Sequence, residues 1–190
     1  MDNGERTRNI PVLLGARRVG RRSERAARFV QSGLSARDGV RTELVDLREV
    51  DLPILTARPD EADSPPPGYP WFHERIAAAD GLVIVAPEYK GGYPGVLKNA
   101  LDHLEAGIFR RKPIGIVTVS SGSFGGMNCL SQLRLVCLAM GGVPIPMNFP
   151  VSSVDTALDD EGHPLDARLE ARLGPFLDEL IWYTRALSGT

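Results

Sequence analysis

The fold of this 190-residue chain is indicated most clearly by residues 82–102, which read LVIVAPEYKGGYPGVLKNALD. The first five residues are all apolar, without alternation, which is typical of a strand buried on both faces of a sheet. After a turn rich in glycine and proline, Val96, Leu97, Ala100 and Leu101 recur at helical spacing. The stretch therefore predicts a buried strand, a loop and a helix in succession.

Four further apolar runs resemble this strand, namely Ile10–Leu14, Leu44–Leu47, Ile114–Val119 and Val143–Ile145. Apolar positions at helical spacing accompany the runs. They predict helices that begin at an N-cap Ser23, precede the third strand at 76–79, follow the fourth strand at 130–140, and end the chain at 169–187. Repeated alternation of strand and helix indicates a parallel sheet covered on both faces. We expect an α/β three-layer sandwich with a five-stranded parallel sheet of the flavodoxin-like order 2-1-3-4-5.

The length and composition fit one ordinary folded domain, since 43% of the residues are hydrophobic and 24% are charged. We assign residues 9–187 to that domain and residues 1–8 to a flexible N-terminal arm. No apolar run approaches the ~20 residues of a membrane helix, and no secretory signal is visible. Cys129 and Cys137 lie ~12 Å apart on one predicted helix and cannot pair, so we expect a reducing, cytoplasmic location.

The net charge of −2 hides an asymmetry along the chain. Residues 1–28 carry eight Arg against three acidic residues, a balance of +5, so the remainder carries −7. Four of these arginines, Arg17, Arg18, Arg21 and Arg22, follow the first strand directly. Because they precede a helix, they are placed to meet a phosphate, although a solvated basic face is the alternative. The acidic remainder argues against a nucleic-acid partner.

Ligands of such sheets bind at the carboxyl ends of the strands. The candidate site therefore consists of loop one (residues 15–23), loop three (residues 86–102, which include the start of the next helix) and loop four (residues 120–126). Two adjacent glycines in loop three permit close approach to a flat ring, and the small residues of loop four suit a planar polar ligand; an ordinary turn is the alternative for loop three. No spacing of metal ligands or nucleophile elbow is present, so we predict neither a metal site nor a catalytic triad. His73, His103 and His163 are expected at surface or interface positions.

Together, the three loops resemble the NADPH-dependent FMN reductase family of flavodoxin-like quinone, azo and flavin reductases. The matching stretches are Leu13–Ser23, Pro87–Asp102 (P-E-Y-x-x-x-x-P-G-x-L-K-N-A-L-D) and Gly122–Arg134, and the resemblance covers roughly residues 9–187. It implies an oxidoreductase that takes hydride from NADPH or NADH onto FMN and passes electrons by ping-pong to quinone, azo, flavin or similar small acceptors. It also implies a homodimer or homotetramer, and no catalytic side chain, because the flavin does the chemistry.

The resemblance assigns cofactor-binding roles residue by residue. The FMN phosphate would lie in loop one, and the ring against loop three, with loop four closing its pyrimidine side. The residues implied are Gly15, Ala16, Arg18, Arg22 and Ser23 for the phosphate, Pro87, Glu88, Tyr89, Lys90 and Gly91 for the ring, and Ser121, Gly122 and Gly125 for the pyrimidine. Three positions depart from the family pattern: Ala16 and Gly92 replace a common Ser, and Lys90 a common Asn or His.

Three alternatives remain open from the sequence. Lys90 beside the expected ring is compatible with a dedicated FMN-dependent dehydrogenase or reductase of a biosynthetic pathway that acts on a small acidic metabolite. A flavodoxin-like electron carrier would share the fold, although the near-neutral charge disfavours it. A non-catalytic binding domain would share the fold but bind no FMN.

Overall fold

Strand β5 (Leu82–Pro87) lies at the centre of a sheet whose strands all run parallel. The computed structural model describes residues 6–58, 61 and 64–188. The sheet order is β4-β2-β5-β6-β7, which confirms the expected order 2-1-3-4-5. The other strands of this path are β4 (Leu44–Asp46), β2 (Val12–Leu14), β6 (Pro113–Val119) and β7 (Val143–Pro144).

The edge of the sheet beside β6 differs from the prediction. β7 ends at Pro144, and a sixth strand, β8 (Phe149–Val151), then pairs with the carboxyl-terminal half of β6. The edge is broken because Pro146 has no N–H for the ladder and interrupts pairing. Pro150 is tolerated inside β8 because β8 is an edge strand, where one row of backbone groups needs no partner strand.

The N-terminal strand also differs from the expected run 10–14. β1 (Arg8–Asn9) pairs with β3 (Val40–Arg41), and pairing resumes at β2 only after Pro11. Arg8 therefore lies in a strand, not in the arm expected for residues 1–8. Arg6 Nη2 donates a hydrogen bond to Asp80 Oδ1 at 3.0 Å, and residues 1–5 lie outside the described residues.

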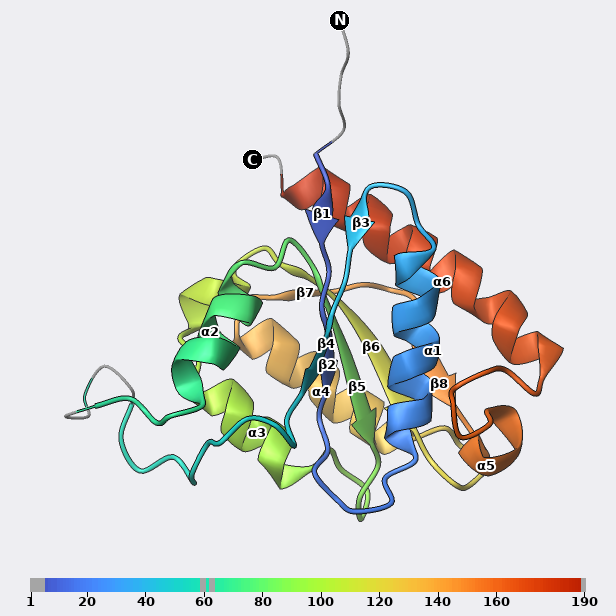
Figure 1. Ribbon diagram of the computed structural model, residues 1–190, viewed down its shortest axis with the longest axis horizontal. Helices are drawn as coiled ribbons and strands as arrows, with labels where there is room; N and C mark the ends of the chain where they lie inside the picture. Colours follow the sequence, from blue (N-terminus) through green and yellow to red (C-terminus); the bar gives the residue numbers. More distant parts are fainter. Residues whose placement is uncertain (1–5, 59–60, 62–63, 189–190) are drawn as a thin grey trace, which may run out of the picture.

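Helices cover both faces of the sheet (Figure 1). On one face lie α1 (Ser23–Ser35) and α6 (Ala167–Leu187); on the other lie α2 (Tyr69–Ala77), α3 (Gly95–Asp102) and α4 (Met127–Ala139). Successive residues of β5 alternate between these faces. Val83 and Val85 pack in the core under α1 and α6, while Ile84 packs in the core under the other helices. This two-sided burial explains why the strand is apolar without alternation.

Two short elements complete the chain, a 3₁₀ turn η1 (Ala106–Phe109) and a one-turn helix α5 (Val154–Ala157). Because the strands are parallel, the loops that follow β2, β5 and β6 emerge at the same edge of the sheet, at the bottom of Figure 1. Among the described helices, none combines the length and apolar character needed to cross a membrane.

Candidate active site

Loops one, three and four enclose a cavity of about 290 Å³ at the carboxyl ends of β2, β5 and β6. Its lining consists of Arg18, Val19, Gly20, Arg21, Arg22, Ser23, Pro87, Glu88, Tyr89, Val119, Ser120, Ser121 and Val154. Seven of the thirteen residues expected to bind a cofactor are among them: Arg18, Arg22, Ser23, Pro87, Glu88, Tyr89 and Ser121. The structure thus brings the three predicted loops together around one space.

Ser23 is the first residue of α1 and is almost completely buried. The prediction that it caps the helix is wrong, since the preceding Arg22 already has helical φ and ψ and no side-chain cap is present. Ser23 Oγ is buried and has no hydrogen-bond partner among the described residues. Such a hydroxyl costs about 1–3 kcal/mol unless a ligand satisfies it. A phosphate fits this place, because the N-terminus of a helix attracts anions.

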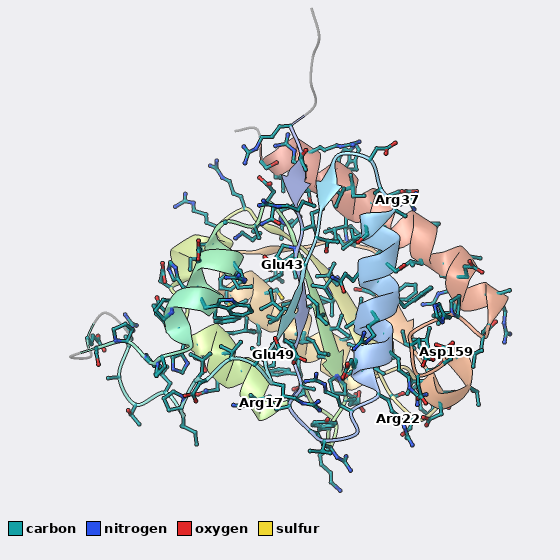
Figure 2. The ribbon with its side chains drawn as sticks, viewed as in Figure 1. Arg17, Arg22, Arg37, Glu43, Glu49 and Asp159 are labelled. Atoms are coloured by element: carbon teal, nitrogen blue, oxygen red, sulfur yellow. The ribbon has the colours of Figure 1, made fainter. Side chains whose placement is uncertain are left out.

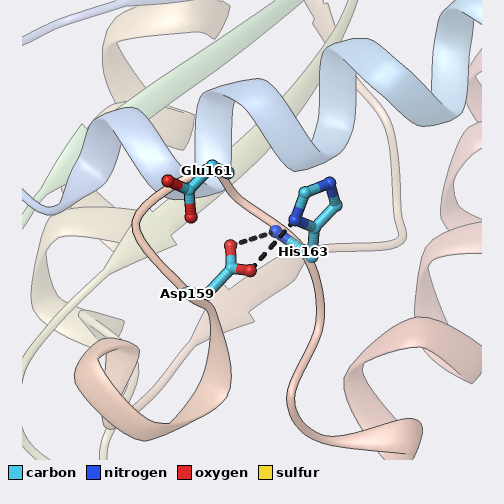
Figure 3. A group of neighbouring side chains, drawn as sticks. All are labelled: Asp159, Glu161 and His163. Carbon is cyan, nitrogen blue, oxygen red and sulfur yellow. Dashed lines mark hydrogen bonds and ion pairs between the residues drawn. The ribbon is translucent and has the colours of Figure 1, made fainter.

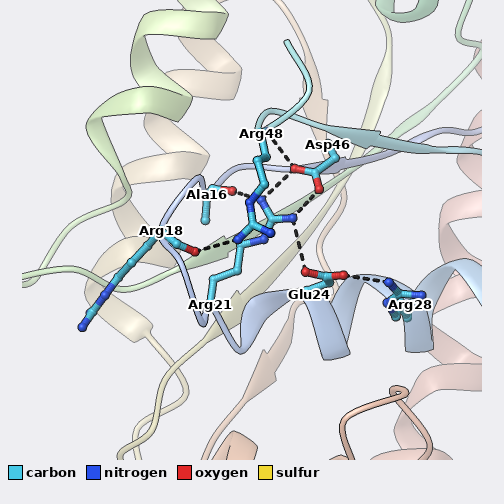
Figure 4. A network of polar contacts seen from close by, with 7 residues as sticks. All are labelled: Ala16, Arg18, Arg21, Glu24, Arg28, Asp46 and Arg48. Atoms are coloured by element: carbon cyan, nitrogen blue, oxygen red, sulfur yellow. Dashed lines mark hydrogen bonds and ion pairs between the residues drawn. The ribbon is translucent and has the colours of Figure 1, made fainter. Parts of the chain in front are cut away.

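Arg21 is not a free cation available to a phosphate, as the four-arginine cluster suggested. Its side chain is only 2% exposed and forms a two-pronged ion pair with Asp46, the last residue of β4. Figure 4 shows the guanidinium directed at Asp46 and Glu24, with a further hydrogen bond to the carbonyl of Ala16. Burial acts to lower the pKa of Arg21, but the hydrogen bond to Asp46 and the nearby carboxylates raise it above its ordinary value. Arg21 is therefore a charged, internal part of loop one.

The other arginines of loop one are exposed, and Arg17 and Arg22 lie at the lower end of the molecule (Figure 2). Arg22 Nε lies 2.5 Å from Asp155 Oδ1, so this guanidinium joins loop one to α5. Arg18 lines the cavity, and its carbonyl accepts a hydrogen bond from Arg48 Nη2 at 3.0 Å. Arg18 and Arg22 thus remain near the cavity, with Arg22 already paired.

Loop three contains a tight turn centred on Lys90 and Gly91. The N–H groups of Tyr89 and Gly92 donate to each other's carbonyls at 2.8 and 3.1 Å, and both central residues have positive φ, 53° and 79°. This is the pattern of a type I′ turn. Gln132 of α4 donates from Nε2 to the carbonyl of Gly91 at 2.8 Å. Lys90 and Gly91 therefore lie at a fixed tip beyond the cavity lining.

Glu88 connects loop three to α4. Its Oε2 accepts hydrogen bonds from the N–H groups of Asn128 and Cys129, each at 3.1 Å. A carboxylate is favoured there because the N-terminus of a helix carries partial positive charge. Glu88 thus forms part of the cavity wall and also holds α4 in place. The sequence had assigned Glu88 only to binding of the ring.

Loop four contributes Ser121 to the lining, whereas its glycines serve the loop itself. The carbonyl of exposed Gly122 accepts a hydrogen bond from the N–H of Ser153 at 2.9 Å. Gly125 has a φ of 63°, and a Cβ there would lie 2.7 Å from Pro150. Phe124 between them is 84% exposed. Loop four is therefore a tightly turned but solvent-facing wall.

Gly15 and Ala16 lie behind the lining, fully inside the protein. A Cβ at Gly15 would lie 2.8 Å from the side chain of Leu97, so a glycine lets α3 pack against the end of β2. Ala16 contributes its carbonyl to Arg21. Sequence reasoning missed Asp46, Arg48 and Val154; only Asp46, a carboxylate inside the predicted apolar strand Leu44–Leu47, gave a usable signal.

No nucleophile is apparent among the described cysteines and histidines. Burial raises the pKa of Cys129 and of Cys137 to about 12, so both remain neutral thiols, and both are free as predicted. His103 is 2% exposed and bonds through Nδ1 to the carbonyl of Asn99, which corrects its expected surface position. His73 contacts Glu105 at 3.0 Å on the surface.

A cluster of possible metal ligands occurs in the turn between α5 and α6 (Figure 3), and none of its residues lines the cavity. Asp159, Glu161 and His163 bring one ligand atom each within 4.8 Å of one another. Asp159 already accepts hydrogen bonds from the backbone N–H and from Nδ1 of His163, at 2.7 and 2.9 Å. These bonds close the turn beside α1, and they account for the cluster without an ion.

Comparison with known proteins identifies the family of the chain. The family model for NADPH-dependent FMN reductase matches residues 8–156. The chain belongs to the NADPH-dependent FMN reductase family. It is 28% identical over 174 residues to the FMN-dependent NADPH-azoreductase of Staphylococcus aureus, an alignment that covers 90% of this chain and 92% of the azoreductase.

Solved structures show the same fold at lower identity. FerB, an NAD(P)H:(acceptor) oxidoreductase from Paracoccus denitrificans, superposes with a TM-score of 0.76 at 22% identity, covering 93% of this chain and 98% of FerB. An NAD(P)H:quinone oxidoreductase from Methanothermobacter marburgensis superposes with a TM-score of 0.61 at 17% identity, covering 92% and 98%. Family membership makes this chain an NAD(P)H-dependent oxidoreductase that uses FMN and NADPH.

Proposed function

We propose that FMN binds in the 290 Å³ cavity with its phosphate against the N-terminus of α1. The observation that carries this proposal is the buried hydroxyl of Ser23, which has no partner among the residues described. Arg18 adds positive charge at the mouth, where Arg22 is paired with Asp155, and the carbonyl of Ala16 ties the beginning of the loop to Arg21. A phosphate ester satisfies these donors better than a carbonyl ligand, because its three acceptor oxygens match several donors at once.

The isoalloxazine ring is proposed to extend from this phosphate toward loop three. Pro87, Glu88 and Tyr89 of loop three form one part of the lining, and Ser121 of loop four forms another. Lys90, Gly91, Gly122 and Gly125 stand behind or beyond that lining, so we assign them to the shape of the walls. Glu88 and Gln132 hold loop three and α4 together, which keeps the wall in place.

FMN, when bound, supplies hydride acceptance from NAD(P)H and electron donation to an acceptor. We propose that the two half-reactions alternate at one open face, as in a ping-pong enzyme. The protein's task is to hold the ring and leave room for each partner in turn. Quinone, azo and flavin compounds are the proposed acceptors, supported by the activities in the names of the azoreductase and quinone oxidoreductase relatives.

We further propose a homodimer or homotetramer formed through the outer face of α4. Leu135 and Leu138 on this face are 69% and 57% exposed, while Leu130 and Leu133 face the core. A helix that is apolar on both sides is typical of a buried helix. A cavity of about 730 Å³, lined in part by Val136 and Met140, lies beside this face. Light scattering of the purified chain tests this assembly; a monomer at micromolar concentration would contradict it.

The cytoplasm is the proposed location. The free, buried Cys129 and Cys137 are typical of a compartment that keeps thiols reduced.

The visible spectrum of the purified chain is the decisive experiment. We expect bound flavin that is released as FMN on denaturation and is bleached by NADPH or NADH under argon. Steady-state oxidation of the nicotinamide with a quinone or azo dye then separates an oxidoreductase from an electron carrier. A colourless protein that fails to bind added FMN would favour a non-catalytic binding domain.

A further inference from the structure

Loop one makes few contacts of its own between Arg17 and Gly20. Val19 is 90% exposed, and a Cβ placed on Gly20 would meet no atom within 4 Å. Gly20 also has a φ of 68°, which favours glycine. A loop that is so open needs an external support if it is to keep one shape before a ligand arrives.

The support comes from the carboxyl end of β4 through Arg21. Arg21 Nη1 donates to Asp46 Oδ1 at 2.7 Å, and Nη2 donates to Asp46 Oδ2. Nη1 also donates to the carbonyl of Ala16, so the same guanidinium fastens the beginning of the loop. Figure 4 shows these bonds converging from both sides of the loop. Because arginine offers several donors in a fixed plane, one side chain fixes Ala16, Arg21 and Asp46 relative to one another.

A second contact from the same strand end completes the link between β4 and loop one. We call this link, formed by Arg21, Asp46 and Arg48, the clamp. The N–H of Arg48 donates to Asp46 Oδ1 at 2.8 Å, and Arg48 Nη2 donates to the carbonyl of Arg18 at 3.0 Å. Asp46 is therefore held by Arg21 and by the backbone of its own strand end. The positions fixed in loop one are Ala16, Arg18 and Arg21, which surround its open part.

The charges around Arg21 indicate that this residue positions loop one rather than presenting a free positive charge to a ligand. The Arg21 guanidinium faces the carboxylates of Asp46 and Glu24, the latter at 3.3 Å from Nη2, and Glu24 also pairs with Arg28. Its positive charge is thus already matched inside the protein. Arg21 Nε and, two residues later, Ser23 Oγ are buried donors without a partner among the described residues. The loop shape set by Arg21 decides where the Ser23 donor lies.

We propose that Arg21, fixed by Asp46, is a positioning residue that shapes loop one for a phosphate ester, so that the protein distinguishes a phosphorylated flavin from the same flavin without phosphate. This inference rests on the proposed binding of FMN at the cavity. It adds that selectivity for the phosphate resides in the clamp between loop one and β4, and not only in the exposed arginines.

The test compares the dissociation constants of FMN and riboflavin, measured by quenching of flavin fluorescence on flavin-free protein. Arg21→Met removes the clamp, and we expect FMN to bind about tenfold more weakly while riboflavin changes less than about twofold. Arg28→Met is the matched control, since it removes another arginine that pairs with Glu24 but does not line the cavity. It is expected to leave both constants unchanged.

Asp46→Asn separates position from charge. If Arg21 acts only as a charge, loss of its counter-ion releases the guanidinium and strengthens FMN binding, which would overturn the proposal. We expect weaker FMN binding instead, with riboflavin unchanged. Because a single substitution can leave a buried charge unpaired, the double variant Arg21→Met/Asp46→Leu serves as a folded comparison. It should fold cooperatively and still have lost the preference for FMN.

The remaining outcomes are equally informative. Equal losses for FMN and riboflavin in Arg21→Met, with a normal unfolding transition, would show that loop one acts without regard to phosphate and would overturn the inference. A wild-type protein that binds neither flavin would refute the proposed function itself. The two failures are distinguished by the wild-type titration alone.

Discussion

Two arginine-rich segments lie at opposite ends of the sheet and use their charges differently. Loop one follows β2 at the carboxyl ends of the strands, whereas Arg110, Arg111 and Lys112 precede β6 at the amino ends. In each segment, one cationic side chain is buried in the interior and the other basic residues are exposed. The buried cations are Arg21 and Lys112, whose exposed fractions as whole residues are 8% and 7%. Composition alone does not separate the two segments.

The helix end that each segment meets explains the difference. Lys112 Nζ donates to the carbonyls of Ile76 and Ala77, the last residues of α2, where a helix carries partial negative charge. The cation there satisfies the helix and needs no ligand. Loop one meets the N-terminus of α1, where the buried hydroxyl of Ser23 lacks a partner among the described residues. A basic segment thus indicates an anion site when it meets a helix N-terminus and leaves donors unpaired.

The largest expected effect concerns Lys112. Burial lowers its pKa to about 8, although Asp80 acts to raise it. Between about pH 8 and its ordinary value near 10.5, the unfolded chain binds a proton that the folded chain has lost, so stability rises with pH. Relative to Lys112→Met, the unfolding free energy of the wild type should rise by roughly 3 kcal/mol across this window. Urea unfolding at several pH values measures the difference.

The same variant tests whether the amino end of the sheet is separate from the flavin site. Lys112→Met should bind FMN as tightly as the wild type, because its contacts lie at the end of α2. Parallel pH profiles for the two proteins would contradict the burial argument. Weakened FMN binding in the folded variant would contradict the division of roles between the two segments.

Much of the fold was predictable from sequence because burial on both faces leaves a direct pattern. The five apolar residues at the start of β5 alternate between two cores, so each of them is buried and apolar. The edge was not predictable in detail. Pro146 separates β7 from β8, whereas Pro150 lies inside β8, and whether the chain resumes pairing beyond a proline depends on the neighbouring strand β6.

The site was predictable as a set of loops but not as a set of contacts. Parallel strands bring loops one, three and four to one edge, and seven expected residues line the cavity. The sequence does not show that Arg21 turns inward to Asp46, since four neighbouring arginines look equivalent until the structure pairs one of them. Similarly, Glu88 reaches α4 forty residues later, a distance that no local pattern encodes. Their assignment to a cofactor remains a prediction.

A smaller effect is expected for Ser23→Ala, which sharpens the comparison at the carboxyl end. Without flavin, removal of a buried hydroxyl that lacks a partner should stabilise the protein by about 1 kcal/mol. With FMN, loss of a hydrogen bond to a charged group should weaken binding by about tenfold. Thermal unfolding without flavin and fluorescence titration with FMN measure the two effects. Opposite signs are the signature of a hydroxyl kept for a ligand.

The opposite effect on stability would count against a role of the Ser23 hydroxyl in binding the ligand. If Ser23→Ala destabilises the flavin-free protein, then the hydroxyl has a partner within the fold. Riboflavin provides the control ligand, because its affinity should not depend on a donor to phosphate.

The smallest effect is expected for a matched pair of exposed arginines, Arg18 and Arg110, one from each segment. Arg18 lines the cavity, whereas Arg110 lies beside the amino end of β6. Because exposed charges are screened by water and salt, Arg18→Ala should weaken FMN binding by only about threefold, and less at high salt. Arg110→Ala should leave FMN binding unchanged at any salt concentration. Equal losses in both variants would mean that the whole basic surface, and not the helix end beside it, attracts the phosphate. A loss confined to Arg18, and reduced by salt, would instead locate the attraction at the N-terminus of α1.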